Sequence, residues 1–311
     1  MTDPTTLNNL RGEIREWLAA NAPHGWRSME QTHAEFAKSQ RDWFLKLVGA
    51  GYAIPHWPAE YPGGGRSLAA QKIIYEELAA ADTPRLLLSF VSTYHAASTL
   101  MECANAEQRA RYLPAILTGE TWCQGFSEPG AGSDLAALKC KAVRDGDHYI
   151  VTGQKIWSTM AQYADKCLLL VRTSNESAKQ AGITFLLMDM HANGVTTRPI
   201  HQIQGDEEFC EIFLDDVRVP VADRVGEEGA GWAVAQTTLS SERGLTLMEL
   251  SYRMRGAQSR LADLIRQNGH CDDSGILRDF GAMAARIDSA CAIADAFLAN
   301  RMNGIEGLGD A

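Results

Sequence analysis

The sequence of 311 residues predicts an α+β multi-domain protein, with helical domains at both ends and an antiparallel β-domain between them. Three observations support this: apolar residues at helical spacing up to about residue 118, short β-rich runs after it, and helical spacing again near the end. We expect an N-terminal helical domain at 1–118, a middle β-domain at 119–226 and a partial C-terminal helical bundle at 227–311. A chain of this length suits two or three packed units.

The N-terminal stretch carries apolar stripes at steps of three and four residues, which is the spacing of one buried helix face. The stripes are Leu7, Leu10, Ile14 and Trp17; then Phe36, Trp43, Phe44 and Leu47; then Ile73, Ile74 and Leu78, followed by the apolar stretch 86–100. The segment 57–65 lies between the second and third stripes. Its prolines and consecutive glycines predict a loop.

The middle part contains short β-rich runs with no helical pattern between them. These runs are Lys139–Arg144, His148–Trp157, Lys166–Thr173, Ile183–Met190 and Glu211–Val219. Asp145-Gly146-Asp147 separates the first two runs and predicts a hairpin turn. Strands at this spacing predict an antiparallel sheet or a small barrel.

The C-terminal part returns to helical spacing, in two long segments at about 230–269 and 274–303 that we expect to pack together. The second segment carries an apolar stripe of Phe280, Met283, Ile287, Ala290, Cys291, Ala294 and Phe297. Two striped helices cannot cover each other's apolar faces fully. We therefore expect an exposed apolar patch that a second copy or a partner chain covers.

Composition excludes several classes of function. The net charge of −10 argues against nucleic acid as the main partner, because nothing resembles a phosphate-neutralising surface. The longest apolar run, near Leu86–Val91, is too short to span a bilayer. The N-terminus has no export-signal pattern, and the seven scattered cysteines include no Cys-x-x-Cys pair. We expect a cytoplasmic protein with reduced core thiols, and neither disulfides nor a metal site.

The most informative segment is Trp122–Asp134, which reads WCQGFSEPGAGSD. It predicts a strand that runs into a Pro-Gly-Ala-Gly turn, whose exposed N–H groups can serve phosphate or carbonyl oxygens. Taken alone, such a turn is more often only a turn. It is not a dinucleotide-binding fingerprint, because the third glycine and the βαβ setting are absent.

This segment resembles the flavin-binding signature of acyl-CoA dehydrogenases, and Gly153–Thr159 (GQKIWST) resembles their second signature. Further matches follow in family order: Ala164-Asp165, Leu170–Thr173, Gly182–Phe185, Pro199-Ile200, Phe213–Pro220, Gly226, Gly231-Trp232 and Glu242-Arg243. The resemblance therefore covers nearly the whole chain.

The resemblance implies FAD as the cofactor and assigns its binding to both segments. The implied flavin-binding residues are Gln124, Phe126, Ser127, Gly132, Ser133, Trp157, Ser158 and Thr159. Ser127 would lie near the pyrimidine edge of the flavin, Trp157 against its face, and the Thr159 hydroxyl toward N5. Without the surrounding motif, a tryptophan in a strand is more often part of the core.

The reaction that the resemblance implies is α,β-dehydrogenation of an acyl-CoA thioester to the 2-enoyl-CoA. A carboxylate removes the α-proton while the β-hydrogen leaves as hydride to flavin N5. Ser133 matches a family position that contacts acyl-CoA, and Arg243 matches another on the substrate side. An electron-transfer flavoprotein or a similar acceptor is the implied redox partner.

Glu242 is the candidate catalytic base. Most relatives place this glutamate late in the C-terminal domain, beyond the end of this sequence. A minority, which includes isovaleryl-CoA, long-chain and some bacterial steroid-CoA enzymes, place it directly before the helix arginine, as in Glu242-Arg243. The alternative is a solvated helix carboxylate in local ion pairs.

Other functions on the same scaffold stay open. The segment Arg266–Gly275 does not match the basic Phe-Gly segment with which many relatives reach a neighbouring subunit's flavin. An incomplete C-terminal domain would favour a second function, in which this chain is a non-catalytic flavin-binding or stabilising subunit of the expected homo- or hetero-oligomer. An oxidase or a flavin monooxygenase is a further alternative. The variant Gln124–Ser127 resembles bacterial members that handle unusual or ring-bearing CoA thioesters. This resemblance implies a branched or bulky acyl group, as in fatty acid or steroid side-chain degradation.

Overall fold

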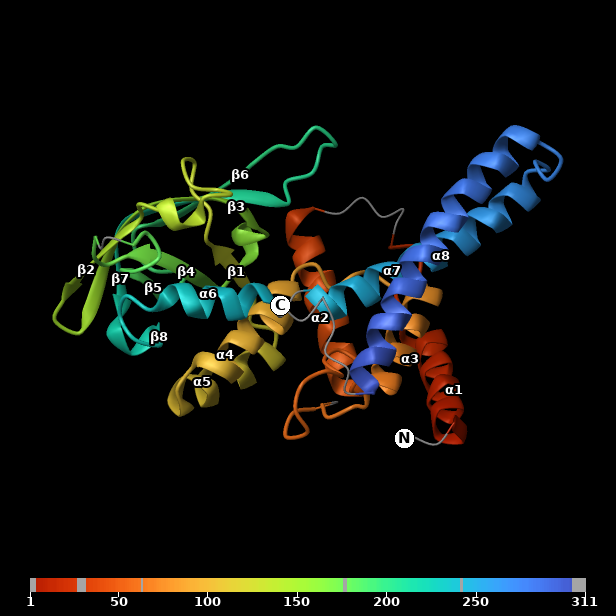
Figure 1. The fold of residues 1–311 in the computed structure, drawn as a ribbon, viewed down its shortest axis with the longest axis horizontal. Helices are drawn as coiled ribbons and strands as arrows, with labels where there is room; N and C mark the ends of the chain where they lie inside the picture. Colours follow the sequence, from red (N-terminus) through yellow and green to blue (C-terminus); the bar gives the residue numbers. More distant parts are fainter. Residues whose placement is uncertain (1–3, 27–31, 63, 176–177, 241–242, 304–311) are drawn as a thin grey trace. The chain divides into compact units, whose positions relative to one another are not determined.

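The computed structural model describes residues 4–26, 32–62, 64–175, 178–240 and 243–303. The chain forms two compact units (Figure 1). The helical unit combines 1–30, 46–85 and 242–311, and the sheet unit combines 31–45 and 86–241. The overall α+β class with helices, a central sheet and helices again is confirmed, whereas the division into three domains stays a prediction.

The helical unit contains α1 (Pro4–Asn21), α3 (Leu68–Ala80), α7 (Arg243–Gln267) and α8 (Ser274–Met302). On α1, Leu10, Ile14 and Leu18 are buried, as the apolar stripe predicts. Helix α1 is also tied to α3 by ion pairs: Arg11 binds Glu76 at 2.6 Å and also binds Glu77, and Arg15 binds Glu77 at 2.7 Å.

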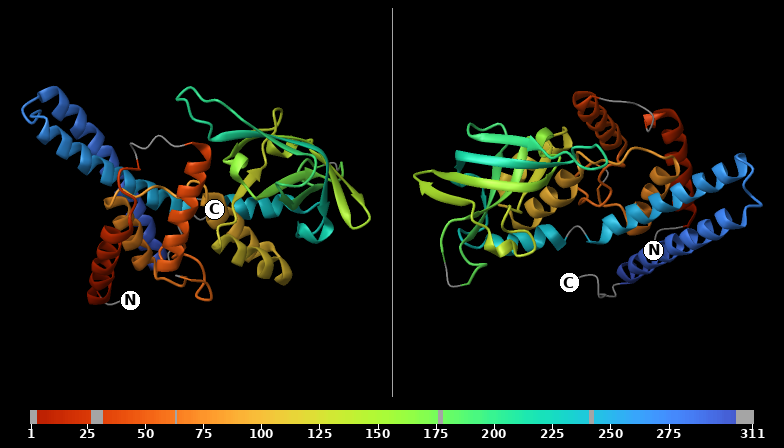
Figure 2. Two further views of the ribbon diagram at one scale, coloured as in Figure 1. Left: turned by 180° about the vertical axis from the view of Figure 1, so that it is seen from behind. Right: turned by 90° about the horizontal axis from the view of Figure 1, so that it is seen from above.

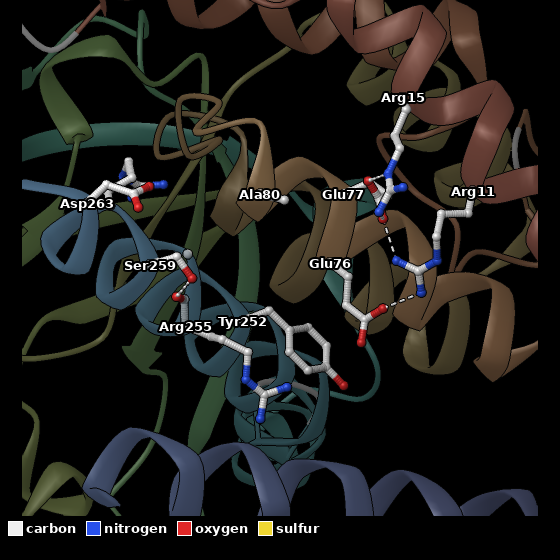
Figure 3. A pocket seen from close by; sticks show the side chains of 11 residues that line it. Arg11, Arg15, Glu76, Glu77, Ala80, Tyr252, Arg255, Ser259 and Asp263 are labelled. Atoms are coloured by element: carbon white, nitrogen blue, oxygen red, sulfur yellow. Dashed lines mark hydrogen bonds and ion pairs between the residues drawn. The ribbon is translucent and has the colours of Figure 1, made fainter. Parts of the chain in front are cut away.

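Figure 3 shows these arginines of α1 facing the glutamates of α3. They line one side of a cavity of about 410 Å³, and Tyr252 and Arg255 of α7 line another. The cavity sits inside a network of paired charges. The ion pairs therefore fasten α1 to α3 beside this cavity.

Helices α7 and α8 form an antiparallel hairpin (Figure 2). Met248, Tyr252, Ala294 and Leu298 of the hairpin pack with Tyr75 and Ala79 of α3 in one buried cluster. At the edge of this cluster, Asp295 accepts hydrogen bonds from Lys72 at 2.6 Å and from Tyr252 at 2.8 Å. Burial alone would raise the pKa of Asp295, but these two hydrogen bonds lower it below its ordinary value. The carboxylate is therefore held ionised between α3, α7 and α8.

The apolar stripe of α8 is only half covered. Cys291 and Ala294 are buried, whereas Phe280, Met283 and Ile287 remain partly exposed. Near the tip of the hairpin, a cavity of about 550 Å³ is lined mainly by apolar side chains: Leu261, Leu264, Ile265, Ile276, Phe280 and Met283. We call these residues the hairpin-tip patch. The described residues of this unit thus leave an apolar surface in solvent.

The sheet unit contains all eight strands of the described chain: β1 (Trp122–Gly125), β2 (Lys141–Asp145), β3 (His148–Thr159), β4 (Lys166–Arg172), β5 (Ile183–Asp189), β6 (Val195–Pro199), β7 (Phe209–Pro220) and β8 (Arg224–Val225). The five predicted runs are confirmed as β2, β3, β4, β5 and β7. The predicted hairpin joins β2 to β3, where Gly146 takes a φ of +61° and Asp145 pairs with His148.

The strand order is β6-β7-β3-β2-β4-β5-β8, with β1 paired to β4 outside this path. Most pairs are antiparallel, but β1 and β2 each run parallel to β4. The sheet is therefore mixed, not wholly antiparallel as the sequence suggested. A parallel pair needs a crossover connection instead of a tight turn, and nothing in the local pattern of a strand reveals it.

Helices pack around this sheet: α2 (His33–Ala50), which contributes to both units, α4 (Ala97–Cys103), α5 (Ala106–Leu117) and α6 (Gly231–Ser240). Short turns complete the unit: η2 (Val91–Ala96, a π-helix), η3 (Leu135–Ala137), η4 (Ala161–Tyr163) and η5 (Val221–Asp223). Helix α6 lies against β5, and a Cβ on Gly231 would stand 2.5 Å from the Phe185 nitrogen. Only glycine fits where this helix begins.

All seven cysteines are free and fall within the described residues. Five are buried, Cys103 is half-buried and Cys271 is exposed. The expectation that the cysteines lie in the core is confirmed for these five. Among the described helices, none combines the length and apolar character that crossing a membrane requires.

Candidate functional site

The two predicted flavin-binding segments meet in the sheet unit, because the residues that follow β1 are hydrogen-bonded to β3. The backbone N–H of Ile156 donates to the Ser127 carbonyl at 2.9 Å. The Lys155 ammonium donates to the Phe126 carbonyl at 3.1 Å. The turn that follows is closed by two backbone hydrogen bonds of 3.0 Å between Glu128 and Ala131. The structure thus brings Gln124, Phe126 and Ser127 beside Trp157, Ser158 and Thr159.

A buried ion pair lies beneath this junction. Lys155 is 0% exposed, and its ammonium binds a Glu128 carboxylate oxygen at 2.9 Å. The same carboxylate accepts the backbone N–H groups of Lys139 at 2.7 Å and of Cys140 at 2.8 Å. Burial raises the pKa of the Cys140 thiol to about 11, and the nearby Lys155 ammonium offsets this only in part. The thiol beside the pair is therefore neutral near pH 7.

Sequence reasoning did not single out Lys155 or Glu128. The alternation of the strand could have revealed Lys155. It lies an even number of residues from Tyr149 and Val151, so its side chain points to the same buried face of β3. A lysine in such a position is almost never buried without a partner. The acidic residue in the neighbouring glycine-rich turn supplies that partner.

Trp157 stands in a β-bulge of β3. Lys155 pairs with Ile212 and Ser158 with Cys210, so two residues of β3 lie opposite one residue of β7. Trp157 takes a φ of +61° there, a conformation that is strained for an aromatic residue. Its side chain is 57% exposed, and its only ring contact among the described residues is edge-on with Phe209 at 6.1 Å. The bulge therefore turns a large flat ring away from the core.

Two buried polar atoms in these segments lack a hydrogen-bond partner within the described residues: Nε2 of Gln124 and the hydroxyl oxygen of Ser158. Buried polar groups are nearly always satisfied, so each atom requires an explanation. In the adjacent turn, a Cβ on Gly130 or Gly132 would meet nothing within 4 Å. An exposed aromatic face, unsatisfied donors and open glycine backbone together fit a planar, polar-edged cofactor such as FAD.

The other predicted site residues differ in their exposure. Phe126 is buried, and its ring packs edge-on against Phe185 at 5.9 Å, so its contribution to the junction is the backbone carbonyl. Ser133 lies exposed after the turn. Glu242 and the side chain of Arg243 fall outside the described residues.

Comparison with known proteins shows which family the chain resembles. The acyl-CoA dehydrogenase N-terminal domain model matches residues 5–120, and the acyl-CoA dehydrogenase middle domain model matches 123–217. The acyl-CoA dehydrogenase IpdE1 of Mycolicibacterium smegmatis is 36% identical over 284 residues, which cover 86% of this chain and 72% of that protein.

Two solved structures are similar over almost the whole chain. The steroid ACAD Tcur3481-Tcur3483 superposes with a TM-score of 0.83 at 30% identity, covering 98% of this chain and 78% of that one. The ChsE4-ChsE5 complex from Mycobacterium tuberculosis gives a TM-score of 0.80 at 31% identity, covering 97% of this chain and 77% of that one. With both family models and these relatives in agreement, the chain belongs to the acyl-CoA dehydrogenase family.

Proposed function

We propose that this protein catalyses the FAD-dependent α,β-dehydrogenation of an acyl-CoA thioester to the 2-enoyl-CoA. The observation that carries the proposal is the strained, solvent-facing Trp157, set beside the unsatisfied Gln124 amide and Ser158 hydroxyl. Strain of this kind persists where surrounding structure enforces it, and it clusters at ligand sites. When bound, FAD supplies the acceptor for the hydride that leaves the β-carbon.

In this proposal the chain's own residues hold the reactants and move one proton. Gln124, Phe126, Ser127, Gly132, Ser133, Trp157, Ser158 and Thr159 hold the cofactor. Ser133 and Arg243 position the acyl-CoA. Glu242 accepts the α-proton. The α C–H group is a poor acid in water, so its proton must be removed by a base held in a site from which water is excluded.

Family membership and the similarity to a steroid ACAD favour a bulky, branched or ring-bearing acyl group. We propose an electron-transfer flavoprotein or a similar protein as the electron acceptor. The seven free cysteines suit a reducing compartment, and we place the enzyme in the cytoplasm.

The decisive experiment is an absorbance spectrum of the purified protein before and after addition of a panel of acyl-CoAs. We expect a yellow protein whose flavin band bleaches with its substrate under anaerobic conditions. A colourless protein that takes up no added FAD would contradict the proposal. Rapid reoxidation by O₂ after bleaching would instead identify an oxidase.

The half-covered stripe of α8 leads to a prediction about assembly. We expect the 34.0 kDa chain to self-associate, or to pair with a second acyl-CoA dehydrogenase-like chain as the ChsE4-ChsE5 complex does. Size-exclusion chromatography with light scattering measures the mass. Leu264→Glu, which charges the hairpin-tip patch, should weaken the association. Val143→Glu, at an exposed position on β2, serves as the matched control. A thermally robust monomer would show that this patch needs no partner.

A further inference from the structure

The segment that leaves β1 accepts three hydrogen bonds from β3, and two of them come from Lys155. Its ammonium binds the Phe126 carbonyl at 3.1 Å and the Glu128 carboxylate at 2.9 Å. The third is the Ile156 N–H, from the next residue of β3, to the Ser127 carbonyl. Glu128 then continues the connection to the backbone at Lys139 and Cys140, on the far side of the turn.

The same lysine immediately precedes the bulge that presents Trp157. Residues 156 and 157 are the two bulged residues, and Lys155 is the last residue in regular register with β7 before them. One side chain therefore fixes the glycine-rich turn relative to the residue whose indole faces solvent. No other described side chain bonds to both the carbonyl of Phe126 and the carboxylate of Glu128.

We infer that the Lys155–Glu128 pair is a positioning device, which sets the 126–131 turn and the Trp157 bulge at the spacing that FAD requires. This inference rests on the proposed function. Stability alone does not account for the pair, because burying two charges costs about as much as their attraction returns, and apolar replacements are often as stable. A buried pair that also satisfies two backbone N–H groups and a carbonyl specifies one geometry of the chain around it.

Replacing Lys155 alone, or Lys155 together with Glu128, separates a contribution to stability from the positioning of the FAD-binding segments. Lys155→Met keeps an unbranched side chain one atom shorter, but it leaves the buried Glu128 carboxylate without its opposite charge. The double variant Lys155→Met with Glu128→Gln removes both charges, so it should recover thermal stability relative to the single variant. It does not restore the hydrogen bond to the Phe126 carbonyl. We therefore expect the double variant to be stable yet to bind FAD weakly.

The matched control is Tyr149→Phe. Tyr149 is also fully buried on β3, and its hydroxyl bonds Glu228 at 2.6 Å and Arg224 at 3.0 Å, away from the turn. Losing these bonds should destabilise the sheet unit without moving the flavin segments. We expect FAD binding by this variant to stay within about twofold of wild type.

Two measurements test the inference. Titration of the FAD-free protein should give an FAD Kd raised about tenfold or more in Lys155→Met and in the double variant, with an altered visible circular dichroism of the bound flavin. Hydrogen exchange in the FAD-free protein should be about tenfold faster or more at the backbone N–H groups of positions 128, 131 and 156 in both variants, but unchanged in Tyr149→Phe.

Three outcomes would contradict either the positioning role of the pair or the proposed function. Wild-type exchange and FAD affinity in the double variant would overturn the inference and leave the pair as part of the core only. The same would follow if Tyr149→Phe lost as much FAD affinity as the two Lys155 variants do. A wild-type protein that binds no FAD would refute the proposed function, while the exchange rates would still decide whether the pair holds the turn.

Discussion

Glu242→Gln is expected to leave FAD bound and to slow substrate bleaching of the flavin by about 10²- to 10⁴-fold, which is the usual contribution of a positioned base. The replacement is nearly isosteric, so folding and cofactor content should be unchanged. Anaerobic stopped-flow absorbance with a good acyl-CoA substrate measures the rate, and the spectrum of the resting protein measures the cofactor.

Glu249→Gln provides the matched control. Glu249 lies on α7 and forms an ion pair with Arg253 at 2.8 Å, which is the role that Glu242 would have if it were only a helix carboxylate. We expect this variant to reduce its flavin at close to the wild-type rate. Equal rates for both variants and the wild type would sink the assignment of Glu242 and point to a base from another chain.

Trp157→Ala is expected to release the flavin. Losing the burial of a large aromatic face costs about 1.5–3 kcal/mol, so the FAD Kd should rise between about 10-fold and about 150-fold. Equilibrium dialysis followed by absorbance of the retained cofactor measures the loss. Trp157→Phe keeps a flat ring and should retain most of the flavin. Unchanged flavin content in the alanine variant would mean that Trp157 is only a structural residue of the sheet and does not contact the cofactor.

The φ of +61° at Trp157 allows a second measurement on the same position. Glycine adopts this conformation freely, so Trp157→Gly should stabilise the FAD-free protein by about 1 kcal/mol relative to Trp157→Ala, while binding flavin equally poorly. Thermal unfolding of the two FAD-free variants makes the comparison. Equal midpoints would show that the bulge carries no strain.

Much of the fold followed from local pattern, because alternation and turn chemistry act within a few residues. β2 and β3 were found from the runs on either side of Gly146, and α8 from its apolar stripe. β6 was missed because it has only 5 residues and none of them is fully buried. The parallel pairs with β4 also escaped, since they depend on where distant segments return to the sheet.

In the candidate site, too, local features could be predicted from the sequence, whereas features that depend on distant segments could not. The flavin segments were recognised from their residues, and their meeting at Ser127 and Ile156 is observed. The bulge at Trp157 could not be predicted, because it arises from a mismatch in length between β3 and β7. The buried role of Lys155 also depends on a partner 27 residues earlier in the chain.

The interleaving of the two units has a consequence for how the chain acquires its structure during synthesis. The chain passes between the units after residues 30, 45, 85 and 241. All segments of the sheet unit have left the ribosome once residue 241 has emerged, so that unit can fold first. Tyr75 and Ala79 of α3 must wait for Met248 and Leu298 to arrive. During that interval the nascent chain presents an uncovered apolar helix face, which is where we expect a chaperone to bind.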